Sequence, residues 1–208
     1  VIALILFILM SIVHFGLCDW SYLGLKKYKW SVSLTHGLNI VFGIIFFHTN
    51  ETFEIFTFLS NLSFNQFQEY LYIVYICYFF LLIRYAYLAI KFTKLRWGIL
   101  EMSIILLVIF LTEPLVAFSI YFCFIHTFKH VKAILKDTSK YLSNNKFITI
   151  TTISFTILTW VGGSLAIIYL HKSFSFDESF IKTLFIGLAA LTLPHMTLVD
   201  IFYRRKFN

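Results

Sequence analysis

Charged residues and proline are both scarce in this sequence. Only 13% of its 208 residues are charged, about half the share found in soluble domains. Two prolines and eight glycines are too few for a flexible linker or a disordered tail. By contrast, 60% of the residues are hydrophobic and the mean hydropathy is +0.85. This composition excludes a water-soluble domain and indicates an integral membrane protein.

Cysteine is scarce as well, and the three cysteines are far apart. Cys18, Cys77 and Cys123 form no cluster, which argues against a disulfide framework and against a cysteine-bound zinc site. The net charge of +7 is compatible with nucleic-acid binding in a soluble protein. In a membrane protein it more often reflects basic loops on one side, so no nucleic-acid partner is expected.

Apolar runs separated by polar breaks predict an all-α fold, a polytopic membrane helix bundle. At about 20 residues per span, we expect about seven transmembrane helices in a single integral membrane domain over residues 1–208. Glu113-Pro114 separates the fourth span from the fifth, because proline disfavours helical geometry in the preceding residue and suits the first turn of the next helix. The expected spans are 1–17, 30–47, 70–92, 97–112, 114–135, 147–170 and 180–202.

Lysine and arginine concentrate in alternate loops. The first, third and fifth loops and the C-terminal tail are basic, whereas the second loop, around residues 48–69, has neither lysine nor arginine. The positive-inside rule therefore predicts a multi-pass protein of the inner (cytoplasmic) membrane with a cytoplasmic C-terminus. Val1 would lie outside, already within an apolar run and without an initiator methionine. We therefore expect an N-terminally truncated chain that lacks at least one upstream helix.

Seven histidines are unusual in so apolar a chain. An ionisable group inside a span is costly and is a functional hypothesis by default. Counting about 1.5 Å of rise per residue places five of them in the cytoplasmic half of the bundle and two at the outer helix ends, where an interfacial role suffices. The five are His14, His36, His126, His130 and His195, and the two are His48 and His171.

His126 and His130 form an H-x-x-x-H pair on one helix face. Residues four apart lie on the same side of a helix, so both imidazoles can reach one metal ion. The alternative is that His130 is only an interfacial residue, since Lys129 and Lys132 lead into a basic loop. The position of His126 well inside the span favours a metal site.

Other polar residues have both a structural and a functional interpretation. His14 is either a metal ligand, with Asp19 as a hydrogen-bond acceptor behind it, or a helix-end histidine bonded to a backbone carbonyl. His195 follows Pro194 and either lines a site or satisfies the carbonyl that proline frees. His36 fits a structural role slightly better than metal ligation. Tyr121, about one turn before His126, either borders a substrate cleft or packs between helices.

The donor types narrow the choice of metal. Imidazole suits zinc, copper, iron and nickel, and the spans contain few carboxylates. An all-histidine site suits a metal that activates dioxygen better than a carboxylate-bridged metal pair. The 26 phenylalanines and 12 tyrosines suit a long apolar substrate, although lipid contact and interhelix packing account for most of them.

Three sequence elements together resemble a known enzyme family. Residues 114–130 fit P-L-x-x-F-x-x-Y-F-x-x-x-H-[ST]-x-x-H, residues 14–19 fit H-F-G-x-x-D, and residues 191–196 fit L-T-x-P-H-M. These elements, in this order and over nearly the whole chain, are similar to those of the Brp/Blh family, the bacterial and archaeal β-carotene 15,15′-dioxygenases.

The resemblance implies a non-haem iron dioxygenase in the lipid bilayer. Its substrates would be β-carotene and O2, its cofactor Fe(2+), and its product two all-trans-retinal, with a functional link to a retinal-binding rhodopsin. The family's ligands correspond to His14, His126 and His130, and a further family ligand, upstream of H-F-G, has no counterpart here. Many members have Arg-Gly where this chain has His36-Gly37, so the resemblance gives His36 no ligand role.

Other classes of membrane protein remain as alternatives. A membrane desaturase or hydroxylase also uses H-x-x-x-H but needs further boxes such as H-x-x-H-H, which this sequence lacks. A bis-His haem membrane protein would pair His126 with His14 or His195. A retinal receptor needs a Schiff-base lysine deep in the last helix, whereas Lys182 is at its outer start. A small transporter would show paired glycine- or proline-broken helices.

Overall fold

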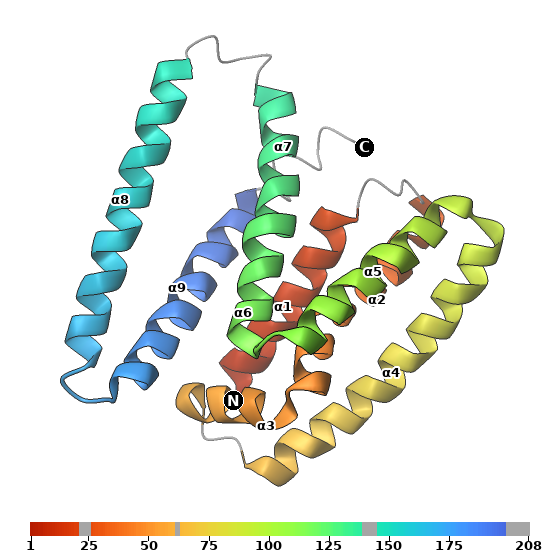
Figure 1. Cartoon of the computed structure of the whole chain (residues 1–208), viewed down its shortest axis with the longest axis horizontal. Coiled ribbons are helices and arrows are strands. Elements are labelled where there is room, and N and C mark those ends of the chain that lie inside the picture. Colours follow the sequence, from red (N-terminus) through yellow and green to blue (C-terminus); the bar gives the residue numbers. More distant parts are fainter. Residues whose placement is uncertain (21–25, 61–62, 139–144, 199–208) are drawn as a thin grey trace. The chain divides into compact units, whose positions relative to one another are not determined.

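The computed structural model describes residues 1–20, 26–60, 63–138 and 145–198, and every element in these ranges is a helix (Figure 1). The predicted all-α fold is confirmed. The contacts divide the chain into two compact units, residues 1–136 and 137–208. The elements are α1 (Ile2–Asp19), η2 (Lys26–Tyr28), α2 (Lys29–Phe47), α3 (Thr49–Leu59), α4 (Phe64–Lys91), α5 (Thr93–Leu111), α6 (Pro114–Ile120), η3 (Tyr121–His126), α7 (Thr127–Thr138), α8 (Asn145–Leu170) and α9 (Phe176–Leu198).

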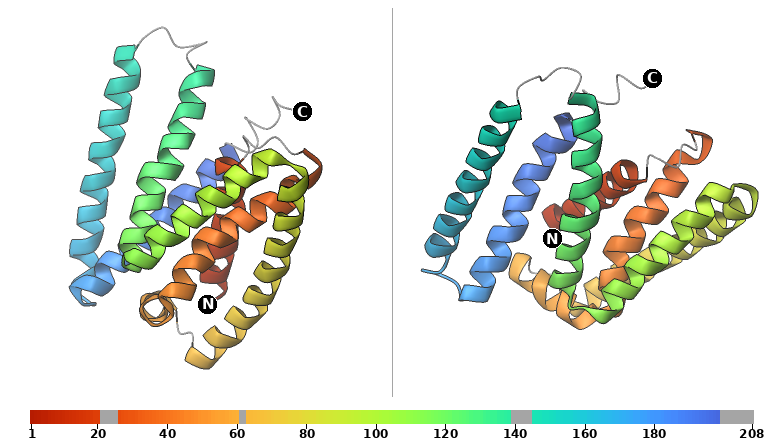
Figure 2. Two further views of the ribbon diagram at one scale, coloured as in Figure 1. Left: turned by 45° about the vertical axis from the view of Figure 1, so that its right-hand side comes forward. Right: turned by 45° about the horizontal axis from the view of Figure 1, so that its top comes forward.

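Helix α2 is the central element of the first unit. It packs against α1, α4 and α5 (Figure 2), and it is the most buried of the long apolar helices. Its side chains enter two hydrophobic clusters, one around Ile40 and Tyr85 and the other around Phe42 and Phe56. Burial on several sides explains why α2 is rich in small and apolar residues over its whole circumference.

Two glycines bring the main chains of α1 and α2 into direct contact. A Cβ atom at Gly16 would lie 2.0 Å from the Ser33 carbonyl oxygen, and one at Gly37 would lie 1.9 Å from the Ile12 carbonyl oxygen. Small residues of this kind let membrane helices approach closely, where packing and not the hydrophobic effect holds them together. The glycine of the H-F-G element therefore sets the position of α1, which carries His14.

The stretch expected to be the second loop is largely helical. Helix α3 occupies Thr49–Leu59, and α4 begins at Phe64, six residues before the expected start of its span. Phe56 and Phe67 are buried against each other, and a capping box between Ser63 and Gln66 starts α4. The connection between the second and third expected spans therefore contains a short helix, α3, whose acidic residues Glu51 and Glu54 are exposed.

The helix that carries the H-x-x-x-H pair is not a regular α-helix. Pro114 occupies its first turn, as predicted, and Glu113 is the N-cap residue. From Tyr121 to His126 the chain forms a π-helix, after which α7 resumes α-helical geometry. A π-turn bonds residue i to i+5 and is often found at functional sites. The predicted continuous helix is confirmed, but its assumed regular α-helical geometry was wrong.

The second unit contains α8 and α9, which pack against each other. Pro194 lies inside α9, as expected for the L-T-x-P-H-M element. Residues 199–208, which include the end of the last expected span and the basic tail, lie outside the described residues. The single membrane domain over 1–208 stays a prediction.

In the part of the chain that the structure describes, five helical stretches are long and apolar enough to cross a membrane. They are Ile2–Asp19, Lys29–Phe47, Phe64–Lys91, Pro114–Lys132 and Thr149–Leu170. Helix α4 exposes a broad apolar surface, which includes Ile76, Phe80 and Ile90, and such a surface suits contact with lipid. Helix α5 contains Lys94, Arg96 and Glu101 and does not meet the same criteria. A polytopic helical membrane fold is therefore shown, whereas the count of seven spans stays a prediction.

Candidate metal centre

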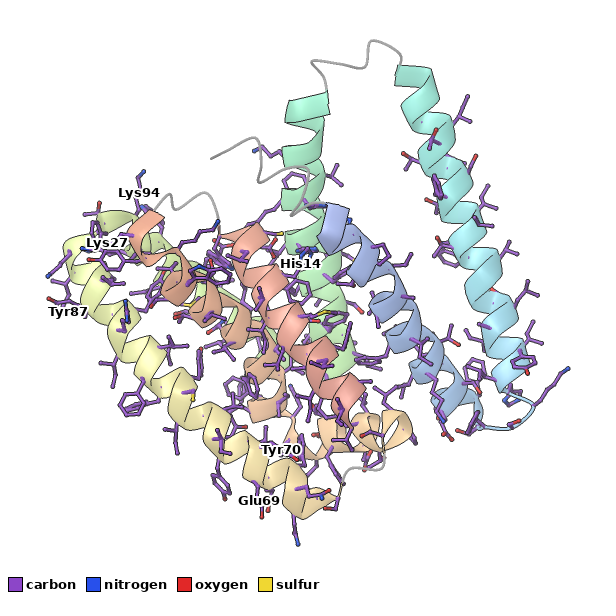
Figure 3. The ribbon with its side chains drawn as sticks, turned by 180° about the vertical axis from the view of Figure 1, so that it is seen from behind. His14, Lys27, Glu69, Tyr70, Tyr87 and Lys94 are labelled. Carbon is purple, nitrogen blue, oxygen red and sulfur yellow. The ribbon has the colours of Figure 1, made fainter. Side chains whose placement is uncertain are left out.

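His14 and His126 come together although 111 positions separate them in sequence. Both are buried, and their ring centroids are 5.1 Å apart. His14 projects from α1, where Figure 3 labels it, and His126 from the end of the π-turn. The Cys18 sulfur lies 3.5 Å from His14 Nδ1. Two of the three proposed ligands are thus neighbours across a helix interface.

Asp19 holds His126 from the end of α1. His126 Nδ1 lies 2.9 Å from Asp19 Oδ1 and 3.1 Å from Oδ2, and the Tyr121 hydroxyl donates to Oδ2. All three side chains are buried. Sequence analysis placed Asp19 behind His14 or at the helix end, but the structure bonds its carboxylate to His126. Asp19, Tyr121 and His126 therefore form one buried cluster, whereas the interpretation of Tyr121 as the border of a substrate cleft stays a prediction.

His130 lies one turn after His126, as the sequence spacing predicts. The two rings are parallel, with centroids 5.9 Å apart and an interplanar angle of 5°. His130 is half-buried. The pair therefore shares one helix face, with the two rings stacked parallel to each other.

Aromatic rings surround His126. Phe15 meets it edge-on at 5.0 Å between centroids, and Phe122 stacks on it at 5.4 Å. Phe15 is buried, and Phe122 is partly so. Sequence analysis did not single out either residue. Their place within H-F-G and within the Y-F pair of the longer motif was the available signal.

An ion pair between Lys129 and Glu101 lies beside the cluster of Asp19, Tyr121 and His126. Lys129 forms an ion pair with Glu101 of α5. The same ammonium group lies 3.4 Å from the Asp19 carbonyl oxygen. It also lies 4.3 Å from the centre of the Trp20 ring. Lys129 thus neutralises Glu101 and binds the C-terminal end of α1, where helix carbonyls carry partial negative charge. Its position between the two histidines was visible in the sequence, but its partners on α1 and α5 were not.

His36 lies in a separate contact network on α2. Its ring stacks on Trp20 at 3.6 Å, and its Nε2 lies 2.9 Å from the Tyr85 hydroxyl. That hydroxyl donates to the Leu95 carbonyl oxygen at 3.3 Å, so His36 Nε2 donates to the tyrosine oxygen. His36 Nδ1 is buried without a hydrogen-bond partner. Through these contacts, His36 joins α2 to Tyr85 of α4 and to Trp20 at the end of α1.

Gly98 makes room for this network, so replacing it with alanine is expected to weaken the fold. An added Cβ would lie 2.1 Å from the Tyr85 oxygen and 3.3 Å from His36 Cε1. We expect Gly98→Ala to lower the free energy of unfolding by about 1–3 kcal/mol, through overpacking and the loss of a buried hydrogen bond. Thermal unfolding in detergent measures this loss.

Gly162→Ala is the matched control for this substitution. Nothing lies within 4 Å of a Cβ added there, so the same change in a helix interior should be neutral or stabilising by about 0.5–1 kcal/mol. Equal unfolding temperatures for Gly98→Ala and the wild-type protein would contradict the proposed packing.

The remaining histidines lie at helix ends or in the second unit. His48 donates through Nε2 to the Ile109 carbonyl oxygen at 2.8 Å and so joins the end of α2 to α5. His171 is exposed beside Phe176. His195 follows Pro194 in α9 and is half-buried. Its role as a site-lining or kink-stabilising residue stays a prediction.

The donor groups are of the chemical type that binds a metal ion through imidazole nitrogen, but they are not gathered around one point. Within the described ranges, no group of three or more His, Cys, Asp or Glu side chains is close enough to hold a metal ion. An ionised carboxylate only accepts hydrogen bonds, so Asp19 keeps the proton of His126 on Nδ1 and leaves the Nε2 lone pair for a metal. With metal–nitrogen bonds of about 2.0–2.1 Å, two imidazoles on one ion have ring centres about 5 Å apart. His14 and His126 meet that spacing.

The fold and this cluster define a class of protein, a polytopic helical membrane protein with a buried histidine–carboxylate site between its helices. Residues 1–203 match the family described as "Beta-carotene 15,15'-dioxygenase". The chain belongs to this family. It is also 29% identical over 202 residues to the "Beta-carotene 15,15'-dioxygenase" of uncultured marine bacterium 66A03, an alignment that covers 97% of this chain and 72% of that protein.

No solved structure matches the chain, so the fold is described from its own structure. The family match places the protein among carotenoid-cleaving dioxygenases and makes it an enzyme. It supports neither a membrane desaturase or hydroxylase nor a bis-His haem protein. The resemblance carried by the three sequence elements is therefore confirmed.

Proposed function

We propose that this protein cleaves the central 15,15′ double bond of β-carotene with O2 and releases two all-trans-retinal. We further propose that His14, His126 and His130 hold Fe(2+). The observation that carries the metal site is the pairing of His14 and His126 at 5.1 Å with Asp19 bonded to His126 Nδ1, in a chain that belongs to this family.

Each residue of the cluster has a defined task in this proposal. When bound, the iron supplies the binding and activation of O2, which organic side chains do not provide. Asp19 orients the His126 ring and balances part of the positive charge that a divalent ion brings. His14 and His130 add two more nitrogen donors, and for His130 this requires its ring to turn away from the parallel position beside His126.

The surroundings of His126 suit an apolar substrate. Phe15 and Phe122 cover two sides of the ring, exclude water and present apolar surface to a polyene. Lys129 and Glu101 neutralise each other, so this ion pair adds no net charge beside the site. A lipid-soluble carotenoid reaches such a site from the bilayer.

The proposed setting is the inner (cytoplasmic) membrane, with the C-terminus in the cytoplasm. The alternation of basic and acidic loops supports this orientation. Retinal released into the same bilayer is available to a retinal-binding rhodopsin, which is the proposed downstream partner.

Expression of the complete gene product in a bacterial host that accumulates β-carotene tests the proposal. We expect all-trans-retinal to appear and β-carotene to fall in the wild-type strain, as measured by liquid chromatography. His126→Ala is expected to lower retinal at least 100-fold, because it removes a metal ligand. Iron analysis of the purified proteins should show a parallel loss.

His171→Ala is the matched control, since His171 is exposed and far from the cluster in the sequence. It should produce as much retinal as the wild-type protein. Retinal from His126→Ala at the wild-type level would refute the metal assignment. Cleavage products of other chain lengths would refute the central position of cleavage.

A further inference from the structure

We propose that Tyr121 is a positioning residue for the proposed metal ligand His126. The π-turn between them allows both side chains to reach Asp19. The Tyr121 hydroxyl fixes the Asp19 carboxylate, and the carboxylate fixes the proton on His126. This inference rests on the proposed role of His126 in binding metal, and it adds a residue that acts through Asp19.

The π-turn brings Tyr121 and His126 to the same side of their helix. In a regular α-helix, residues five apart are rotated by about 140° relative to each other and cannot both face one side chain of a neighbouring helix. The π-helix spans Tyr121–His126, and its i to i+5 geometry aligns its first and last residues. Both side chains accordingly bond the carboxylate of Asp19.

Tyr121 and His126 share the Asp19 carboxylate, and His126 Nδ1 lies within hydrogen-bond distance of both of its oxygens. Tyr121 donates to Oδ2, and Oδ1 is the oxygen nearer to His126 Nδ1, at 2.9 Å. Asp19 and Tyr121 are each only 2% exposed, so water is not available to replace either partner. Lys129 binds the backbone carbonyl of Asp19. One stretch of helix thus holds Asp19 at both its side chain and its main chain.

Ordinary packing does not require this arrangement. Tyr85 is equally buried and satisfies its hydroxyl with the Leu95 carbonyl oxygen and His36. The Tyr121 hydroxyl instead donates to Asp19, the carboxylate that bonds His126. The π-turn separates Tyr121 from His126 along the helix. Phe15 packs edge-on against both the Tyr121 ring and the His126 ring, which limits the rotation of each.

The consequence concerns which nitrogen of His126 carries the proton. A fixed carboxylate keeps the proton on Nδ1 and leaves Nε2 as a metal donor. Without the tyrosine hydroxyl, Asp19 Oδ2 keeps only its 3.1 Å contact with His126 Nδ1, and the carboxylate is freer to turn. His126 then also populates the tautomer protonated at Nε2, which cannot bind metal through that atom.

Nitrogen NMR of ¹⁵N-histidine-labelled, metal-free protein in detergent at pH 8 tests the inference directly. In the wild-type protein we expect His126, assigned by its loss in His126→Gln, to be protonated at Nδ1. Tyr121→Phe should show a second population protonated at Nε2. Tyr85→Phe is the matched control, because it removes an equally buried hydroxyl outside the Asp19 cluster, and it should leave the His126 signals unchanged.

Cobalt binding gives the second measurement. We expect Tyr121→Phe to bind Co²⁺ about tenfold more weakly than the wild-type protein, the usual effect of losing a group behind a ligand, whereas Tyr85→Phe should bind with wild-type affinity. If Tyr121→Phe fails to fold, Asp19→Asn takes its place, since it keeps the side-chain volume but offers no charged acceptor. The same mixed tautomers are expected.

The outcomes separate this inference from the proposed function. Unchanged His126 signals together with unchanged Co²⁺ affinity in Tyr121→Phe would overturn the positioning role, even if the enzyme makes retinal. A wild-type protein with His126 protonated at Nε2 would overturn it as well. Mixed tautomers in Tyr121→Phe would support it even if no retinal is formed, because the NMR measurement involves neither iron nor substrate.

Discussion

Asp19→Ala is expected to be among the most damaging single substitutions in the protein. It removes the acceptor of two buried donors, the Tyr121 hydroxyl and His126 Nδ1, and each unpaired donor costs about 1–3 kcal/mol. We therefore expect the free energy of unfolding to fall by about 3–5 kcal/mol, as for a broken buried pair. Retinal formation should fall below detection.

Thermal unfolding in detergent and chromatography of cell extracts measure the two effects. Asp177→Ala is the control, because Asp177 is an exposed acid in the first turn of α9 and should change stability by less than about 0.5 kcal/mol. Wild-type stability of Asp19→Ala would show that the carboxylate is not buried as described. Wild-type retinal formation would show that it does not serve the metal site.

Alanine at Gly16 or Gly37 is expected to separate α1 from α2. The added Cβ would lie about 2 Å from a carbonyl oxygen of the opposite helix, at 2.0 Å for Gly16 and 1.9 Å for Gly37. Main-chain atoms cannot swing aside as a side chain does, so we expect a loss of about 3 kcal/mol, near the upper end of overpacking costs. Because α1 carries His14 and Asp19, metal binding should fall together with stability.

Gly43→Ala on α2 controls for the loss of a glycine alone. Its Cβ would meet only side-chain ends, Leu106 Cδ2 at 2.8 Å and Ile109 Cδ1 at 3.2 Å, which can shift. We expect a smaller loss of stability and an unchanged affinity for Co²⁺ in equilibrium dialysis. If Gly16→Ala and Gly43→Ala behave alike, the close approach of the two main chains is not what positions His14.

The helices and the histidine pair were predictable from local patterns. Apolar runs of span length, the Glu113-Pro114 break and the i, i+4 spacing of His126 and His130 are all features of contiguous sequence. The structure agrees with the break and with the spacing, and among the described residues five helical stretches are long and apolar enough to cross a membrane. The sequence elements also indicated the family. These signals do not depend on which helices are neighbours.

The contacts across helices were not predictable from the same patterns. Asp19 was expected near His14 because the two are close in sequence, whereas its partners Tyr121 and His126 are more than 100 positions away. The π-turn has no proline or glycine to mark it. Lys129 looked like part of a basic loop, because only the packed structure shows Glu101 and the end of α1 beside it.

The π-turn between Tyr121 and His126 also determines whether the protein can lose a residue from this segment. A π-turn accommodates one residue more than the regular helix would hold, and shortening the segment by one residue would restore regular helical hydrogen bonds. The shorter helix would gain local stability but rotate Tyr121 by about 100° away from Asp19. Local helix geometry alone therefore favours a deletion that neither the buried Tyr121–Asp19 hydrogen bond nor the proposed metal centre would tolerate.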